Sequence, residues 1–286
     1  LAGEWLKAEK ELVASLHAAD SPFLGNLAAA LAAQGQGDID KRDNYLAQAH
    51  RHSSANALAT EMTQAQLQLL AGQNEQALAT LTRVQARHPQ QTQAVRLLIE
   101  AHRRLRDWQN LARRLPEARR RRLLPDAELD ALERETQREL LSLPLPPGAL
   151  DALHQAWSGV SENARRHPDL IGVYARQLIQ QNAMDECTAL LAAALERQWD
   201  ERLVLLYSEA RDSQPAAQLE TAEEWLARHG ESPALLLTLG RLARRNRLAE
   251  RARGYLEKSI GLGATAEAHA ELGMLFEEAG DSARAL

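Results

Sequence analysis

Two neighbouring stretches near the carboxyl end decide the fold: Leu-Gly-Arg-Leu-Ala-Arg-Arg-Asn at 239–246 and Arg-Gly-Tyr-Leu-Glu-Lys-Ser at 253–259. Both are rich in residues that lose little side-chain entropy in a helix. Small side chains at Gly240 and Ala252 would let two such helices approach closely, with Leu239 and Gly240 of the first facing Ala252, Leu256 and Ser259 of the second. The spacing therefore predicts an antiparallel helix hairpin with a short turn between the two stretches.

The same spacing recurs elsewhere in the chain. Gly240 and Ala252 return as Gly273 and Ala285, 33 residues later in each case. A second set recurs after 34 residues, in which Gly72, Ala77, Leu81 and Val84 correspond to Arg106, Leu111, Leu115 and Ala118. A period of this length is typical of the tetratricopeptide repeat (TPR), which is a helix hairpin. We therefore expect an all-α, TPR-like α-solenoid of antiparallel helix hairpins that forms a right-handed superhelix.

Further hairpins follow from the positions of turn residues and prolines. We predict them at 23–49, 58–89, 92–118 and 168–194, with turns at 35–37, 72–74, 106–107 and 181–182. The last two turns of the chain are expected at 245–247 and 279–281. The hairpin at 23–49 fits the pattern less well, because Arg42 occupies a position where a small residue is expected.

The middle of the chain interrupts the repeat. Residues 126–141 predict one longer helix, and the following Ser-Leu-Pro-Leu-Pro-Pro-Gly at 142–148 opposes helix formation. We therefore predict an N-terminal TPR-like block at 1–141, a Pro-rich linker at 142–148 and a C-terminal block at 149–286 whose last repeat is truncated. Because the sequence starts at Leu1 without Met and ends inside an unfinished hairpin, we expect it to be a fragment of a longer protein.

Composition excludes several classes of protein. Apolar residues make up 45% and charged residues 26%, as in a globular chain, whereas aromatic residues make up only 4%. The net charge of −5 argues against a uniformly basic nucleic-acid binder. No window contains the ~18 uninterrupted apolar residues of a membrane span, and no signal peptide is present. The lone Cys187 is expected to be a small buried hydrophobic residue.

No motif for catalysis or metal binding is present. The nine histidines are scattered, and only His50 and His52 are close, at a spacing that does not share a helix face. The sequence has neither His-Glu-x-x-His nor Cys-x-x-Cys, and its glycines fall at hairpin turns instead of in a phosphate-binding loop. We therefore predict a protein that is not an enzyme and has no metal site.

The order of the hairpin motifs resembles that of the HemY family. The resemblance rests on three pairs of motifs: Ala-Gln-Gly-Gln-Gly-Asp (33–38) before Asn-Tyr-Leu-Ala-Gln-Ala (44–49), Arg-Asp-Trp (106–108) before Leu-Ala-Arg-Arg-Leu-Pro (111–116), and 239–246 before 253–259. The resemblance implies a bacterial inner-membrane protein with two membrane helices upstream of Leu1 and a cytoplasmic TPR region. It also implies an assembly factor for haem-biosynthesis enzymes, with no catalytic residue to carry over.

Arginines recur on the helices that open the predicted hairpins. The first helix of a TPR hairpin lines the concave face, and residues seven apart, such as Arg96 and Arg103, share one stripe. Arginine suits bidentate capture of carboxylates. Repeat alignment gives a candidate partner-binding groove of Arg96, Glu100, Arg103, Arg176, Arg241 and Arg244. The alternative is that these are solvated arginines on exposed helix faces.

A denser basic patch contains six cations in ten residues, in a run that Pro116 interrupts in the sequence: Arg113, Arg114, Arg119, Arg120, Arg121 and Arg122. Acidic residues from Asp126 to Glu135 could balance it as a solvated helix end. Alternatively, the patch could bind an anionic membrane surface or an acidic partner, with each arginine near anionic lipid contributing about 1 kcal/mol.

These observations leave two functional hypotheses. In the first, the chain is a scaffold without a cofactor whose groove holds an acidic segment of a partner protein, in particular a haem-biosynthesis enzyme. In the second, it is a carrier that binds haem or another porphyrin through its propionates, with Arg96, Arg103, Arg176 or Arg241. A porphyrin carrier should shift the Soret band on titration, whereas a peptide scaffold should not.

Overall fold

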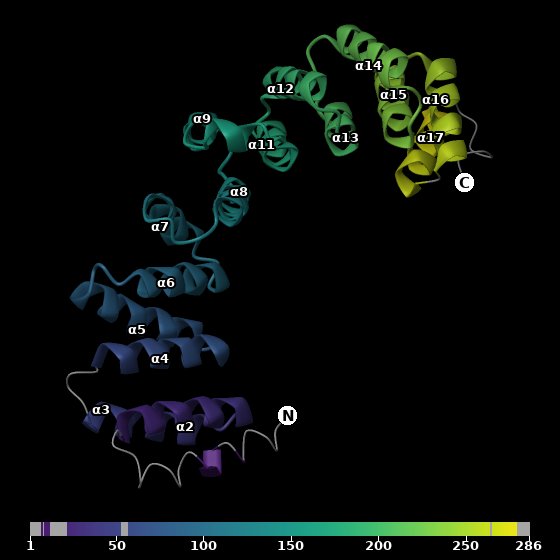
Figure 1. Cartoon of the computed structure of the whole chain (residues 1–286). Helices are drawn as coiled ribbons and strands as arrows, with labels where there is room; N and C mark the ends of the chain where they lie inside the picture. Colours follow the sequence, from purple (N-terminus) through teal and green to yellow (C-terminus); the bar gives the residue numbers. More distant parts are fainter. Residues whose placement is uncertain (1–6, 8, 12–21, 53–56, 264, 279–286) are drawn as a thin grey trace. The chain divides into compact units, whose positions relative to one another are not determined.

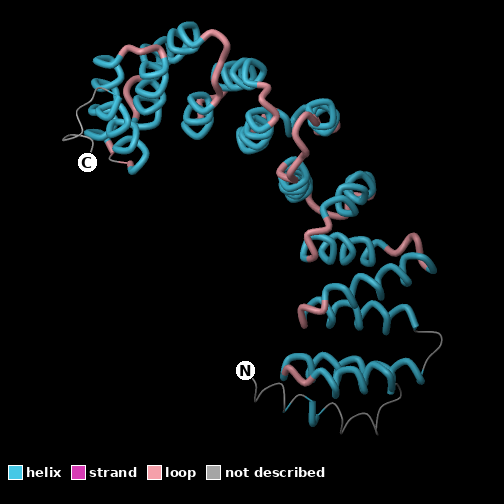
Figure 2. Tube along the Cα trace, turned by 180° about the vertical axis from the view of Figure 1, so that it is seen from behind, coloured by secondary structure: helices cyan, strands magenta, loops and turns pink. Residues whose placement is uncertain are grey.

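The computed structural model describes residues 7, 9–11, 22–52, 57–263 and 265–278. In these ranges the chain is helical with short connecting loops and contains no strand (Figure 2). Short loops join the helices, and many helices that follow each other along the chain pack together, as α4 does on α5 and α15 on α16. The structure thus confirms the predicted all-α chain of antiparallel helix hairpins.

The chain divides into two compact units, Leu1–Thr136 and Gln137–Leu286. In unit 1, α2 packs on α3, α4 on α5 and α6 on α7 (Figure 1). The boundary between the units lies inside α8, a long helix at the residues where the sequence predicts one. The helices of unit 1 are α2 (Pro22–Gln36), α3 (Ile39–His52), α4 (Ala57–Leu70), α5 (Asn74–Arg87), α6 (Thr92–Arg104) and α7 (Trp108–Arg120), followed by α8 (Asp126–Leu141).

Unit 2 continues with residues 142–149, which include the predicted linker and form no helix. Buried side chains from α9 and from α11 through α17 then form one hydrophobic core. The helices of unit 2 are α9 (Leu150–Ser158), α10 (Glu162–Arg165), α11 (Pro168–Gln180), α12 (Met184–Arg197), α13 (Glu201–Glu209), α14 (Pro215–His229), α15 (Pro233–Arg245), α16 (Ala249–Leu262) and α17 (Ala266–Glu278).

The predicted turns share one backbone geometry. At each, one residue adopts a positive φ, and the N–H of the next residue donates to the carbonyl five positions earlier, as in Asp107 to His102 (2.9 Å). This arrangement satisfies carbonyls that the end of a helix leaves unpaired. The positive-φ residues are Gly37, Gly72, Arg106, Asn182 and Arg247, which confirms the predicted turns; the turn predicted at 279–281 lies outside the described residues.

The close approach predicted at Gly240 is present between α15 and α16. A Cβ atom at Gly240 would lie 2.6 Å from both Cγ and Cδ2 of Leu256, a separation that real side chains do not adopt. Ala252 is fully buried in the same contact region. The predicted register of this hairpin is therefore confirmed, whereas its predicted repetition at Ala285 lies outside the described residues.

The small-x3-apolar-x2-small pattern marks the buried face of the second helices. In α5, Ala77, Leu81 and Val84 are fully buried. The corresponding residues of α7 are Leu111, Leu115 and Ala118, which are equally inaccessible. Because their side chains meet the preceding first helix, this pattern positions the hairpins. Cys187 is buried as predicted, and burial raises the pKa of its thiol to about 12.

Two residues that fit a helix interior poorly are accommodated by their surroundings. The helix α7 continues through Pro116 to Arg120. Burial of Leu115 and Ala118 on either side of the proline supplies packing that outweighs its helix-breaking tendency. Arg42 does occupy an interior slot: it is 1% exposed, and its guanidinium contacts Asp43 (2.7 Å) and Gln34 (2.9 Å).

Candidate functional site

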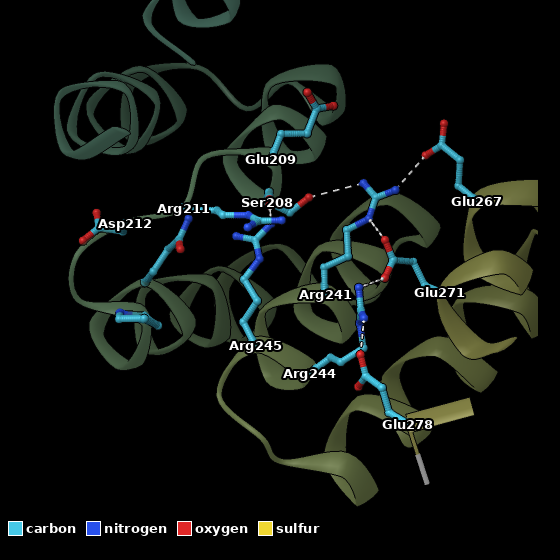
Figure 3. A pocket seen from close by; sticks show the side chains of 12 residues that line it. Ser208, Glu209, Arg211, Asp212, Arg241, Arg244, Arg245, Glu267, Glu271 and Glu278 are labelled. Carbon is cyan, nitrogen blue, oxygen red and sulfur yellow. Dashed lines mark hydrogen bonds and ion pairs between the residues drawn. The ribbon is translucent and has the colours of Figure 1, made fainter. Parts of the chain in front are cut away.

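The larger candidate site, the α15 pocket, is a cavity of about 680 Å³ in unit 2 (Figure 3). Its walls come from α13, from the loop that leads into α14 together with the start of α14 itself, and from α15 and α17. Three of these helices, α13, α15 and α17, open hairpins. Two of the predicted groove arginines line it. The lining residues are Ser208, Glu209, Arg211, Asp212, Pro215, Gln218, Arg241, Arg244, Arg245, Glu267, Glu271 and Glu278.

Arg241 and Arg244 form ion pairs with α17. The Glu271 carboxylate accepts from Arg241 Nε (2.8 Å) and from Arg244 Nη2 (2.9 Å), and it is only 14% exposed. Two outer carboxylates complete the network, Glu267 at 3.3 Å from Arg241 and Glu278 at 2.7 Å from Arg244. The positive charge of these two arginines is therefore largely balanced within the molecule, which the sequence pattern did not predict.

Arg245 has a different environment in the same pocket. Its Nη1 donates to the carbonyl of Ala210 (3.0 Å) and its Nη2 to the carbonyl of Ser208, both at the carboxyl end of α13. A cation at this end of a helix interacts favourably with the exposed carbonyls. Burial lowers the pKa of Arg245, and the nearby charge of Arg211 lowers it further.

A corresponding interaction occurs in unit 1. Arg104 Nη1 donates to the carbonyl of Leu69 (2.5 Å), 35 residues earlier, at the carboxyl end of α4. Arg104 and Arg245 each lie two residues before a positive-φ turn residue. These arginines therefore connect each first helix to the preceding one. Sequence reasoning missed this contact, although the shared position relative to the turn was a usable signal.

The smaller candidate site, the α6 pocket, is a cavity of about 330 Å³ within unit 1. Arg103 pairs with Glu135 of α8 (2.9 Å), and Glu100 pairs with Arg104 of its own helix (2.6 Å). Arg96 is exposed, and its Nε donates to the carbonyl of Leu123. No carboxylate among the described residues pairs with Arg96. The pocket is lined by Arg96, Ile99, Glu100, Arg103, Leu124, Glu128, Ala131, Leu132 and Glu135.

The predicted groove residues are distributed over both units. Arg96, Glu100 and Arg103 line the α6 pocket, whereas Arg241 and Arg244 line the α15 pocket. Arg176 is exposed on α11, lines neither pocket and has no ion-pair partner within the described ranges. Whether these residues bind a partner remains a prediction.

The basic patch is only partly exposed. Arg119 pairs with Asp130 (2.6 Å) and Glu133 (3.0 Å), two of the acidic residues that the balanced-charge interpretation names. Arg121 pairs with Glu117 (2.9 Å), which that interpretation does not name. Arg114 differs because it points inward and donates to His102 and Gln85. Arg120 and Arg122 are exposed without an ion pair in the described part of the chain, and Arg113 donates only to Asn110.

His102 is the most buried histidine of the described residues, at 4% exposure. Its Nδ1 lies 3.0 Å from Asp107 Oδ2, and Arg114 Nε donates to its Nε2 at 3.1 Å. An acceptor Nε2 and a donor Nδ1–H satisfy both contacts in the neutral ring. Burial lowers the pKa of His102, and the Arg114 charge acts in the same direction. No group of three or more metal-ligating side chains gathers in the part of the chain that the structure describes.

Comparison with known proteins gives a consistent set of similarities, although no family model matches the chain. The chain is 25% identical over 241 residues to Protein HemY of Escherichia coli (strain K12), and Protein HemY of Shigella flexneri matches equally. The match covers 83% of this chain and 60% of the curated relative, so the chain spans well under two thirds of that protein. The resemblance inferred from the hairpin motifs is confirmed.

Solved structures that match the chain include the APC/C hetero-tetramer Cut9-Hcn1, at 15% identity and a TM-score of 0.41, covering 99% of this chain and 61% of that one. A tetratricopeptide repeat protein from Parabacteroides merdae matches at 14% identity and a TM-score of 0.38, covering 89% of this chain and 98% of that one.

None of the described helices combines the length and the hydrophobicity that a membrane-spanning segment requires.

Proposed function

We propose that this HemY-like TPR chain is a non-catalytic scaffold that holds an acidic segment of a partner protein against the arginines of its first helices. The α6 pocket supports this proposal most directly. Arg96 has no carboxylate partner in this pocket, and Arg103 lies seven residues later on the same face of α6. Two guanidinium groups in one concave site suit a segment that carries several carboxylates.

Competition from the protein's own carboxylates is weak in the α6 pocket. The Arg103 and Glu135 side chains are 51% and 30% exposed, and ion pairs this exposed contribute only about 0–1 kcal/mol. A partner carboxylate can therefore replace Glu135 at Arg103 at little cost. It can also reach the Arg96 guanidinium, whose one hydrogen bond among the described residues uses Nε alone.

The setting that we propose follows the similarity to Protein HemY. The parent protein would be anchored in the bacterial inner membrane by helices upstream of Leu1, with the TPR region on the cytoplasmic side. The partners would be haem-biosynthesis enzymes, whose assembly or coordination the scaffold would assist. No observation in the described residues favours the porphyrin carrier, so the scaffold is the function that we propose.

A direct test compares acidic-peptide binding by two double variants. Reversing Arg96 and Arg103 to Glu should abolish binding of a fluorescent peptide of alternating Glu and Ala, measured by anisotropy. The control reverses Arg51 and Arg83, two exposed arginines on second helices that have no ion pair among the described residues. Both variants should keep the wild-type helical circular dichroism. Equal binding by the wild type and by the Arg96/Arg103 variant would refute this function.

A second experiment addresses the partners. Crosslinking of the membrane-anchored parent protein in cells should yield haem-biosynthesis enzymes with the wild type and not with the Arg96/Arg103 variant. If the same enzymes are crosslinked to both, the proposed groove is not the site of contact.

A further inference from the structure

Arg211 and Arg245 form a pair of cations that has no carboxylate partner among the described residues. Arg211 is exposed in the loop after α13, and Figure 3 shows its side chain reaching toward the Arg245 guanidinium beside Ser208. The two hydrogen bonds of Arg245 go to main-chain carbonyls, which bear no net charge. Two positive charges therefore lie together in a cavity without a direct ion pair among the described residues, although the charge of Glu271 acts on Arg245 from farther away.

The acidic residues nearest in sequence do not neutralise this pair. The Asp212 carboxylate accepts from Thr188 Oγ1 and from the backbone N–H of Gln214 (2.8 Å). Figure 3 shows Glu209 and Asp212 extending away from the two guanidinium groups. The carboxylates of α17 are already bound to Arg241 and Arg244. The Arg211–Arg245 pair is thus the part of the α15 pocket where an incoming anion meets no competing carboxylate contact.

The backbone that carries Arg211 is held in place. The Ala210 carbonyl accepts from Arg245 Nη1 (3.0 Å) and from Gln218 Nε2 (3.0 Å), and Gln218 also donates to the Tyr207 carbonyl (2.7 Å). Gln218 is 3% exposed, so these hydrogen bonds are shielded from water. Because Arg211 directly follows Ala210, these hydrogen bonds fix the backbone from which the Arg211 side chain extends. Less conformational entropy is therefore lost when a ligand binds.

The like-charge contact also has an electrostatic consequence. The charge of Arg211 lowers the pKa of Arg245 in addition to the larger effect of burial, so the two guanidinium groups repel each other. An anion placed between them would remove this repulsion and form charge-assisted hydrogen bonds to both guanidinium groups.

We propose that Arg211 and Arg245 bind one carboxylate of the acidic partner segment, with Arg211 as the recognition residue. This inference rests on the proposed function and adds a contact site in unit 2 that the predicted stripe of arginines does not contain. Arg241 and Arg244 then act as positioning residues, because their ion pairs with α17 shape the wall of the pocket.

The test uses the full chain and the same fluorescent peptide of alternating Glu and Ala. Arg211→Gln should weaken binding roughly tenfold, the loss expected for one charge-assisted contact. Arg197→Gln is the matched control, because Arg197 is an exposed arginine of unit 2 that donates only to a carbonyl of its own helix. Arg211→Lys should bind more tightly than Arg211→Gln and less tightly than the wild type. All three variants should unfold at the wild-type temperature.

The outcomes separate this inference from the function on which it rests. Wild-type protein that does not bind the peptide refutes the proposed function. Binding that survives Arg211→Gln but is lost in the Arg96/Arg103 variant overturns the Arg211 site alone. Equal weakening by Arg211→Gln and Arg197→Gln also overturns it, because net charge would then explain the effect.

Discussion

The α6–α7 and α15–α16 hairpins share a turn geometry but are held together differently. Between α15 and α16, Gly240 lets Leu256 pack against the backbone, and these helices pack more closely than α6 and α7. Between α6 and α7, a buried polar contact of His102 with Asp107 and Arg114 connects the two helices. Because the turn geometry is common to both hairpins, we expect their different interior residues to determine how each pair responds to substitution and pH.

The largest effect is expected in the closely packed hairpin. Ala252 is fully buried, so Ala252→Leu should overpack the contact between α15 and α16 and lower the free energy of unfolding by roughly 1–3 kcal/mol. The measurement is chemical denaturation, with hydrogen exchange of α15–α16 peptides as a local readout. Ala193→Leu, at an exposed position of α12, is the control and should change stability by less than about 0.5 kcal/mol. A loss near zero at Ala252 would show that the assigned register is wrong.

The ion pairs of the two pockets should also differ in their contribution to stability. Glu271→Gln removes the charge that Arg241 and Arg244 share in a poorly exposed site, and it should cost roughly 1–2 kcal/mol. Glu135→Gln removes the partner of the half-exposed Arg103, where solvent screening limits the loss to below about 1 kcal/mol. Denaturant titration of both variants tests this order. A larger loss for Glu135→Gln would contradict the comparison.

The α6–α7 and α15–α16 hairpins should also differ in how their stability depends on pH, although this effect is smaller than the two above. The pKa of His102 lies below the unfolded-state value of about 6.5, so the unfolded chain binds a proton first as the pH falls. Stability should therefore decrease as the pH drops below about 6.5, by at most about 1.4 kcal/mol per pH unit from this group. The groups that face the ring are Asp107 and Arg114, and Arg114 also contacts Gln85.

Hydrogen exchange at several pH values can localise this effect. Protection of α6–α7 peptides should decrease on acidification, whereas α15–α16 peptides should change less. His102→Gln should flatten the response of α6–α7, and His88→Gln, at an exposed position, should leave it unchanged. An unaltered response in His102→Gln would assign the pH dependence to other groups.

Much of the fold could be predicted because the sequence repeats its inter-helix contacts. The hairpins at 58–89, 92–118 and 168–194 followed from small and apolar residues whose burial the structure confirms. The pair α13 and α14 was not predicted. Its first helix is short, and the loop at 210–214 contains no positive-φ residue to mark the turn. Its packing depends on Tyr207 and Trp225, which contact each other across the pair and do not follow the repeat pattern.

The candidate site was less predictable than the fold. Arg103, Arg241 and Arg244, which the sequence singled out, line pockets, but their ion-pair partners were not predicted. These partners, Glu135 and Glu271, belong to the next first helix. Such pairs depend on how one repeat stacks on another, which helical periodicity does not specify. Arg114 was assigned to an exposed patch, yet it turns inward because His102 and Gln85 offer acceptors in the hairpin interior.

The salt dependence of acidic-peptide binding to the wild-type chain tests the central claim most directly. If arginines in the grooves recognise carboxylates, the affinity should fall steadily as ionic strength rises from about 0.01 M to about 1 M, over which the Debye length shrinks from about 30 Å to about 3 Å. The fall should be smaller for Arg211→Gln, which removes one exposed cation. An affinity that is indifferent to salt would contradict the claim and show that the peptide binds through other contacts.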